Sequence, residues 1–378
     1  MISPGEAVLV SSGEATPVVG VPTSPVELMA RASLAALAAA GLTVRDVDGL
    51  AASSIDYYMP TLSLGDQLGI HPVFMDSTSL GGSSALGQLE HAIDAIRARR
   101  CDVVVISFGS TSRSDPPDIH RLTERSAYEA PHGYVYPLGG FALMAARHMH
   151  LYGTKPEQMA QLAVNARRWA ALTPGAERPE LLTVEEVLAS SLIVSPLHRL
   201  DCCLVSDGAA AIVVARYDRA VEMTPHPVHI LGLASTQSHR HILGMPDLAE
   251  SPARESGRRA LGQAGFRADE VDVLELYDAT TMALLMTLED LGLCEKGEGG
   301  AYVAETNFGP TGRRPLNTNG AGLAYRHPGM LGLYLLGEAM AQLQGRAGAR
   351  QVKGAKTALV HALCGVFGAS ATAVLSTE

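Results

Sequence analysis

The sequence places a tyrosine and a histidine where they could move a proton together. Tyr325 stands two residues before His327, which begins a His-Pro-Gly run. A phenol has an ordinary pKa of about 10, so a tyrosine that relays a proton needs a hydrogen-bonding partner or a local positive charge. We expect His327 to be that partner. With a backbone amide, His327 could also hold a developing oxyanion, a contact that contributes roughly 3 to 4 kcal/mol when it is preorganised.

Five cysteines are the other side chains with reactive chemistry. Their number is odd and no C-x-x-C pair occurs, which disfavours both a disulfide framework and a zinc knuckle. Each is then either a buried apolar thiol or a reactive one. Cys364 is set in the glycine-rich stretch C-G-V-F-G. The other four are predicted to be packing residues, and they are Cys101, Cys202, Cys203 and Cys294.

The elements that must position these side chains follow an alternating strand and helix pattern. A Val-rich strand is predicted at 7–10, an amphipathic helix over 26–40, and further strands over 48–52 and 103–108. Strands that are almost continuously apolar suit a sheet whose two faces are both covered. The pattern therefore indicates an α/β fold.

An internal repeat is the most informative feature of the organisation. Residues 37–41 and 46–48 recur as residues 261–265 and 270–272, at a constant offset of 224 residues. Downstream of each copy the order repeats again, with a glycine-rich turn, an amphipathic helix and a strand. The chain is therefore interpreted as two homologous halves.

We place the two halves at residues 1–220 and 221–378. Between about 111 and 200 the strand and helix rhythm is interrupted by polar sequence that contains Pro and His, and by a helical stretch over 155–172. An insertion of this size on a compact scaffold is usually functional. We expect it to help build a substrate pocket.

The charge balance excludes some classes of partner. Lys and Arg number 29 against 39 Asp and Glu, which gives a net charge of −10 and argues against nucleic acid and anionic membranes as partners. The first basic residue is Arg31, and no apolar run approaches the roughly 20 residues of a membrane span. We expect a cytoplasmic protein that holds any anionic ligand locally.

Four motifs in order resemble those of the thiolase superfamily, and within it the sterol-carrier/lipid-transfer-protein thiolases. They are D-C-C at 201–203 with S-D-G-A-A at 206–210, E-L-Y-D-A-T at 275–280, N-T-N-G at 317–320 with H-P-G at 327–329, and C-G-V-F-G at 364–368. The resemblance implies a thiolase-like α/β fold of two βαβαβαββ halves in α-β-α-β-α layers. It also implies a coenzyme A thioester as substrate, with no bound cofactor and no metal.

Two positions depart from the thiolase pattern. Ser79 stands where the family has its nucleophilic cysteine, and no cysteine lies within twenty residues of it. A hydroxyl has little anionic character at pH 7, so acyl transfer through Ser79 would need an adjacent base that the local sequence does not supply. Tyr277 replaces the histidine of the family's H-D-A-F block. Tyrosine at both 277 and 325 resembles the thiolase-fold retro-aldolases that remove the side chain from steroid acyl-CoA thioesters.

The resemblance also implies roles for individual residues. The predicted catalytic residues are Tyr277, Tyr325, His327 and Cys364, and the predicted substrate-binding residues are Ser79, Asn319, Gly320 and Gly365. Simpler interpretations stand beside these, because a tyrosine at the end of a strand is often a core residue and a buried cysteine is often inert. Ser79 is expected to line the pocket and not to act as a nucleophile.

Three functions remain open at this point. The first is a carbon-carbon lyase, a retro-aldolase acting on a β-hydroxyacyl-CoA with a bulky, steroid-like side chain. The second is an acyl-CoA C-acyltransferase that uses Ser79 or Cys364. The third is a non-catalytic acyl-CoA carrier or scaffold.

Two protein partners are expected from the resemblance. Thiolase-fold chains pair through the edge strand of the first half, which we place at 103–108, so a homodimer is predicted. The retro-aldolases also work with a small acyl-CoA-binding protein that carries a zinc ribbon and an OB-like barrel. This chain has neither a metal motif nor a clear basic clamp for coenzyme A, so a partner of that kind is expected here too.

Overall fold

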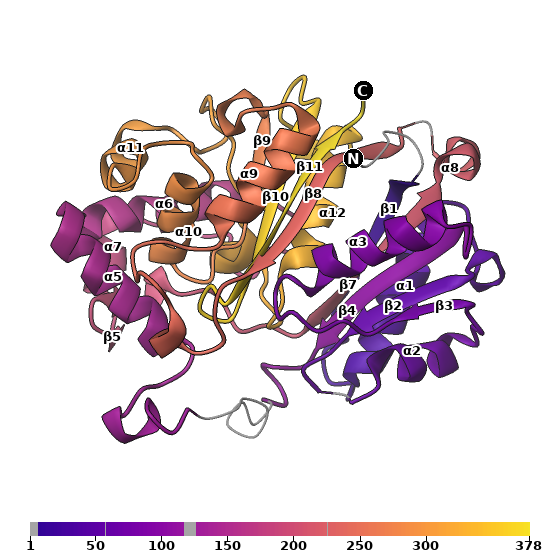
Figure 1. Cartoon of the computed structure of the whole chain (residues 1–378), viewed down its shortest axis with the longest axis horizontal. Coiled ribbons are helices and arrows are strands. Elements are labelled where there is room, and N and C mark those ends of the chain that lie inside the picture. The colour runs from indigo at the N-terminus through magenta and orange to yellow at the C-terminus, as the bar shows by residue number, and fades with distance from the viewer. Residues whose placement is uncertain (1–6, 57, 117–125, 225) are drawn as a thin grey trace.

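A single mixed sheet runs through the molecule, as a computed structural model of residues 7–56, 58–116, 126–224 and 226–378 shows (Figure 1). Within these residues its strand order is β3-β2-β4-β7-β1-β8-β11-β10-β9. Its strands are β1 (Ala7–Ala15), β2 (Gly49–Ser53), β3 (Phe74–Asp76), β4 (Val103–Ser110), β7 (Gly208–Arg216), β8 (Val228–Gln237), β9 (Val273–Leu276), β10 (Thr357–Cys364) and β11 (Ala369–Ser376). A separate hairpin pairs β5 (Leu192–Val194) with β6 (Leu197–His198).

Helices cover both faces of this sheet. They are α1 (Pro25–Ala39), α2 (Pro60–Leu68), α3 (Ser84–Arg97), α5 (Leu138–Tyr152), α6 (Pro156–Ala170), α7 (Val184–Ala189), α8 (Tyr217–Met223), α9 (Ala253–Ala264), α10 (Thr281–Asp290), α11 (Gly299–Glu305) and α12 (Gly332–Leu343). Side chains fix several of their starts: Ser24 accepts a hydrogen bond from the Glu27 amide at α1, and Thr280 accepts one from the Ala283 amide at α10. No helix of the described ranges has both the length and the apolar character needed to cross a bilayer.

The two halves of the chain use the same strand order about a shared centre. From the centre outward the first half runs β1-β7-β4-β2 and the second half runs β8-β11-β10-β9. In each half the outer pair is parallel and the others are antiparallel. The halves meet where Val8 of β1 pairs with His229 of β8. The strand that β3 adds to the first half is reduced in the second half to one parallel bridge between Leu274 and Leu316.

The predicted repeat corresponds to the same local structure in both halves. In each copy a helix, α1 or α9, ends at a left-handed glycine and is followed by a short 3-10 turn and a strand, β2 or β9. Glycine also brings the helix close to its strand, because a side chain at Gly13 would collide with the backbone of α1 and one at Gly232 with that of α9. The predicted boundary after residue 220 falls within α8.

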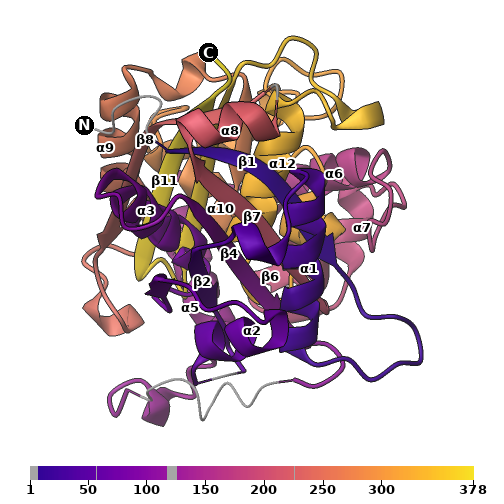
Figure 2. The same cartoon turned by 90° about the vertical axis from the view of Figure 1, so that its right-hand side faces the viewer.

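The helices lie in layers around the sheet. α3 and α12 contact each other and also strands from both halves, so they form a central layer (Figure 1). On the outer side, α1 covers β1, β4 and β7 (Figure 2), whereas α9 covers β8 and β11. This arrangement is the α-β-α-β-α layering that the sequence predicts.

The prediction that residues 103–108 form an edge strand is wrong. β4 lies between β2 and β7, and every residue of Val103–Ser110 is buried. Its continuous apolar sequence reflects a strand with a neighbour on each side and helices on both faces. The edges of the sheet are β3 in the first half and β9 in the second.

The predicted insertion lies against the second half of the chain. Its helices α5 and α6 contact α10, and α6 also contacts α11 and the turn at Ala321–Tyr325 (Figure 1). Residues 117–125 of the insertion are outside the described residues. The insertion therefore packs beside the segment that carries His327.

Candidate active site

Tyr277 and His327 form a hydrogen-bonded pair inside the second half. Tyr277 follows β9 directly, and its backbone amide donates to the carbonyl of His361 in β10 at 3.0 Å. The Tyr277 hydroxyl lies 2.7 Å from His327 Nε2 and 3.4 Å from the carbonyl oxygen of Gly329. The rings meet edge to face, with centroids 5.5 Å apart. His327 is thus paired with Tyr277, whereas the sequence had suggested Tyr325.

The backbone on both sides of His327 is held firmly. The turn Ala321–Tyr325 is π-helical, a distortion that occurs often at functional sites. The Asp278 carboxylate accepts hydrogen bonds from the amides of Gly322 and Leu323, at 2.8 and 3.0 Å. The His327 amide donates to Ser206 Oγ at 2.9 Å, and the Ser206 amide donates to the His327 carbonyl at 3.1 Å. These contacts fix the imidazole against the Tyr277 hydroxyl.

Burial keeps the pair neutral. It lowers the pKa of His327 to about 4, although hydrogen bonds to the backbone carbonyls of His327 and Leu204 oppose the shift. Burial also raises the pKa of Tyr277 well above its usual value, and the nearby Cys203, Asp278 and Cys364 add to the increase. At neutral pH the phenol therefore keeps its proton and can donate it to an unprotonated Nε2.

Cys364 lies next to this pair, at the end of β10. A Cβ atom built on Gly81 would stand 2.8 Å from Cys364 Sγ, and one built on Gly82 would collide with the Tyr277 ring. Glycine at both positions therefore allows the start of α3 to approach the cysteine and the tyrosine closely. Burial raises the pKa of the Cys364 thiol, so at neutral pH this group holds a proton that it could give away.

Ser79 has surroundings that do not activate a nucleophile. Its side chain is exposed and makes no hydrogen bond with any other described residue. An unactivated serine hydroxyl is a weak nucleophile at neutral pH. The part of the chain that the structure describes thus places no hydrogen-bonded base at Ser79 for acyl transfer.

Asn319 and Gly320 support the turn that leads to His327. Asn319 Oδ1 accepts a hydrogen bond from the Ala321 amide at 2.8 Å. Gly320 has φ +96°, and a Cβ atom there would lie 2.9 Å from the Cβ of Ala170 in α6. Both residues are buried in these contacts, and their role in substrate binding stays a prediction.

Tyr325 belongs to a different cluster from Tyr277. Its hydroxyl donates to Glu14 Oε2 at 2.6 Å, and its ring lies 5.0 Å from the guanidinium carbon of Arg326. The Tyr334 ring also lies nearby, with 6.4 Å between the centroids of the Tyr325 and Tyr334 rings. A catalytic role for Tyr325 stays a prediction that these contacts do not test.

Two residues near Cys364 were missed by the sequence analysis. Tyr136 reaches Gly365 from the insertion, and Arg240 stacks on the Tyr136 ring. The only signal in the sequence was the pair Tyr134 and Tyr136 within a polar stretch, in a chain whose aromatic content is just 5%. Nothing in that stretch indicates which surface it packs against.

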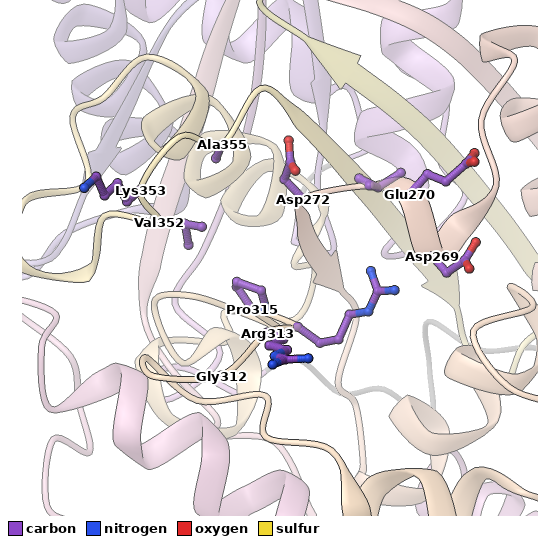
Figure 3. A pocket seen from close by; sticks show the side chains of 11 residues that line it. Asp269, Glu270, Asp272, Gly312, Arg313, Pro315, Val352, Lys353 and Ala355 are labelled. Atoms are coloured by element: carbon purple, nitrogen blue, oxygen red, sulfur yellow. The ribbon is translucent and has the colours of Figure 1, made fainter.

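A hollow elsewhere on the surface is separate from this site. A shallow pocket of about 280 Å³ is lined by residues 269–272 and 312–315, and by Val352, Lys353 and Ala355 (Figure 3). It lies beyond the start of β9, whereas Tyr277 follows the end of that strand. Its lining carries charges of both signs. In the described residues no cluster of His, Cys, Asp and Glu could hold a metal ion, here or elsewhere.

Comparison with known proteins gives several matches. The family model described as "Thiolase C-terminal domain-like" matches residues 234–377. An acetyl-CoA acetyltransferase of Methanothermobacter thermautotrophicus is 32% identical, over 83% of this chain and 82% of its own length. A 17-hydroxy-3-oxo-4-pregnene-20-carboxyl-CoA lyase of Mycobacterium tuberculosis is 33% identical, over 85% of this chain and 86% of its own. The solved structure titled "Ltp2-ChsH2(DUF35) aldolase" has 29% identity and a TM-score of 0.88, and the match covers 99% of this chain and 98% of that one.

Proposed function

The chain belongs to the thiolase superfamily, in its sterol-carrier/lipid-transfer-protein branch, and from this premise we propose that it is a carbon-carbon lyase. It acts as a retro-aldolase on a β-hydroxyacyl-CoA thioester whose acyl group is bulky and of steroid type. The observation that carries the proposal is the Tyr277 hydroxyl 2.7 Å from His327 Nε2, beside a cysteine and in a chain that lacks the thiolase nucleophile. The names of the lyase and aldolase relatives support the reaction class.

The proposed cleavage begins with a proton relay. The substrate β-hydroxyl gives its proton to the Tyr277 oxygen while the phenolic proton moves to His327 Nε2. The Cβ–O bond becomes a carbonyl, and the Cα–Cβ electron pair passes into the thioester as an enolate. The relay never requires a free phenolate, which agrees with the direction in which burial shifts the pKa of Tyr277.

Cys364 completes the proposed reaction as an acid. Its thiol is protonated at neutral pH because burial raises its pKa, so it can deliver a proton to the enolate Cα. The products are a ketone or aldehyde and the shortened acyl-CoA. The thiolate then regains a proton from solvent while His327 loses one, which restores the free enzyme. The coenzyme A thioester is substrate, and no step uses a cofactor.

Acyl transfer is the weaker alternative, although one relative is named as an acetyltransferase. A ping-pong acyltransferase needs a thiolate or an activated hydroxyl to carry the acyl group. Ser79 is exposed and makes no hydrogen bond to a base among the described residues. Cys364 has a raised pKa, which reduces the fraction present as thiolate.

We propose two protein partners as well. The first is a second copy of the chain, paired through β3. Within the described residues this strand forms an edge of the sheet, and the side chains of Met75 in the strand and of Val73 just before it are exposed. The second is a small OB-fold/zinc-ribbon protein that binds acyl-CoA. It is supported by the structural neighbour, whose title pairs Ltp2 with a DUF35 protein.

One incubation separates the three candidate functions. The purified chain is incubated with a β-hydroxyacyl-CoA, or with a β-ketoacyl-CoA and free coenzyme A. Each incubation is run with and without a candidate OB-fold/zinc-ribbon partner protein, and the masses of the products and of the protein are measured by mass spectrometry. Release of a carbonyl compound and a shortened acyl-CoA from the β-hydroxy substrate alone is expected. Thiolysis of the β-keto substrate, or an acyl adduct on Ser79, would establish the acyltransferase instead. Binding of the acyl-CoA without formation of any product would indicate the non-catalytic carrier or scaffold.

A further inference from the structure

Tyr136 reaches the candidate active site from the insertion. A Cβ atom built on Gly365 would lie 2.5 Å from the Tyr136 hydroxyl, so the phenol rests on the turn that directly follows Cys364. Gly365 has φ +56°, a conformation that favours glycine. The Tyr136 side chain is half-buried and its hydroxyl has no hydrogen-bond partner among the described residues. A phenol in this position has a donor to offer to a ligand.

Arg240 supplies positive charge at the same place. Its guanidinium carbon lies 5.8 Å from the centroid of the Tyr136 ring. Arg240 forms no ion pair with another residue of the described ranges. A cation over the face of a phenol draws on the ring electrons and makes the hydroxyl a stronger hydrogen-bond donor.

The segment that carries Arg240 is fixed to the Cys364 turn. The Ser238 amide donates to the carbonyl of Gly368 at 2.9 Å, and His239 Nε2 lies 2.9 Å from the carbonyl of Val366. The insertion is attached to the same segment, because the Leu243 amide donates to Glu129 Oε1 at 3.0 Å. Two distant parts of the chain thus hold Tyr136 and Arg240 in place, as preorganised catalysis requires.

The reaction proposed above leaves one requirement unmet. Charge develops on the thioester oxygen as the Cα–Cβ bond breaks, and that oxygen needs a donor. Tyr277 is already committed to His327, and the Cys364 thiol is committed to Cα. The Tyr136 hydroxyl is a donor beside the Cys364 turn that has no other partner among the described residues.

We propose that Tyr136, with Arg240 stacked on its ring, is a further catalytic residue that donates its hydroxyl to the thioester oxygen as the enolate forms. The assignment rests on the proposed retro-aldol function and names the group that recognises the enolate. No bond to Tyr136 forms or breaks. The phenol keeps its proton, and the hydrogen bond strengthens as negative charge accumulates on the oxygen.

The test compares binding of two coenzyme A derivatives to the full chain by titration calorimetry. Carboxymethyl-CoA carries a carboxylate in place of the thioester enolate, whereas free coenzyme A lacks it. Wild type is expected to prefer carboxymethyl-CoA, and Tyr136→Phe to weaken that binding about tenfold or more while leaving coenzyme A unaffected. Arg240→Met should reduce the same preference, and Arg240→Lys should restore part of it.

Tyr134→Phe is the matched control, because Tyr134 comes from the same stretch but its hydroxyl packs against Gly140 of α5. Equal affinity of wild type and Tyr136→Phe for carboxymethyl-CoA, or no preference in wild type, would overturn the assignment. In turnover assays Tyr136→Phe should lower kcat with little change in KM. A wild type that cleaves no β-hydroxyacyl-CoA yet shows the preference for carboxymethyl-CoA would reject the retro-aldol function and keep Tyr136 as an oxyanion donor.

Discussion

The hydroxyl of Tyr277 and Nε2 of His327 lie 2.7 Å apart, although fifty residues separate them in the chain. The contact exists because the end of β9 and the turn at Ala321–Tyr325 are joined by Asp278, which accepts two amide hydrogen bonds from that turn. A tyrosine in this place has the geometry of a proton relay, whatever its substrate.

Replacing the phenol should therefore abolish most of the activity. We expect Tyr277→Phe to lower turnover of a β-hydroxyacyl-CoA by roughly a hundredfold or more, since proton transfer contributes that much or more in enzymes. Circular dichroism and thermal unfolding should match wild type, because the ring still packs on Gly82. Ser79→Ala is the control and should keep activity within a few fold. Full activity in Tyr277→Phe would reject the relay.

The pH profile of wild type provides an independent check on His327. The imidazole accepts a proton only when it is neutral, and burial lowers its pKa to about 4. We therefore expect protonation of His327 to have no effect on kcat/KM near neutral pH. kcat/KM should fall through this group only as the pH approaches about 4. A decline centred near 6.5, the ordinary pKa of histidine, would show that the imidazole is not buried in the free enzyme.

Tyr325 gives a prediction that separates two roles. Its hydroxyl donates to Glu14, and its backbone ends the turn that precedes His327. If the phenol positions that turn, Tyr325→Phe and Glu14→Ala should lower turnover by similar amounts, about tenfold, and the double variant by no more. We expect this result from a double-mutant cycle. A hundredfold loss in Tyr325→Phe that Glu14→Ala does not share would place Tyr325 in the proton relay.

The sequence predicted the paired halves because local features encode them. The repeated helix and strand, with the left-handed glycines at Gly41 and Gly265, recur with the same local structure in both halves. The prediction that residues 103–108 form an edge strand was wrong for a physical reason. Their apolar sequence indicates a strand that is buried on both faces, but it does not indicate which strands pair with it. Sheet order depends on contacts between distant segments.

The same limit explains what was found and missed at the site. Tyr277, His327 and Cys364 stand in motifs that mark them individually, but their pairing depends on how β9, β10 and the π-helical turn come together. Tyr136 has no motif. Its approach to Gly365 is decided by how the insertion docks on the second half, and the local sequence carries no signal for that.

A buried histidine outside the catalytic pair should make the fold sensitive to acid. His361 in β10 is fully buried, neither ring nitrogen has a partner among the described residues, and burial lowers its pKa to about 3. The unfolded chain takes up the proton near 6.5, so the stability that the neutral side chain contributes is present above that pH and is lost as the pH falls toward 3. Between pH 7.5 and pH 5 this contribution to the free energy of unfolding falls by about 2 kcal/mol.

His361→Leu should remove this sensitivity. Between pH 7.5 and pH 5, the free energy of unfolding of the variant is expected to fall by about 2 kcal/mol less than that of wild type, as measured by urea unfolding at both pH values. The slope with denaturant should be unchanged, because the fold is the same. Equal losses in the two proteins would mean that His361 is accessible to protons in the folded state.

The exposed edge strand β3 predicts how two copies assemble. Val73 is 70% exposed and Met75 is 54% exposed, at the end of the sheet that has no neighbouring strand in the described chain. We expect light scattering to give twice the chain mass of 39.7 kDa, and Met75→Lys to shift the protein toward monomer because charge on an edge opposes pairing. Leu181→Lys, at another exposed apolar residue, should leave the dimer intact. A mass near 40 kDa at every concentration would reject the dimer.

The expected acyl-CoA-binding partner should change both affinity and turnover. The net charge of the chain is −10, which is unfavourable for coenzyme A phosphates, so basic contacts from a second polypeptide would help to hold them. The chain alone should bind acyl-CoA weakly and turn over slowly, and both affinity and turnover should rise when an OB-fold/zinc-ribbon partner protein is coexpressed and copurified with it. Their interface should bury upwards of about 1,000 Å². Full activity of the isolated chain, or failure of the two proteins to copurify, would contradict the need for a partner.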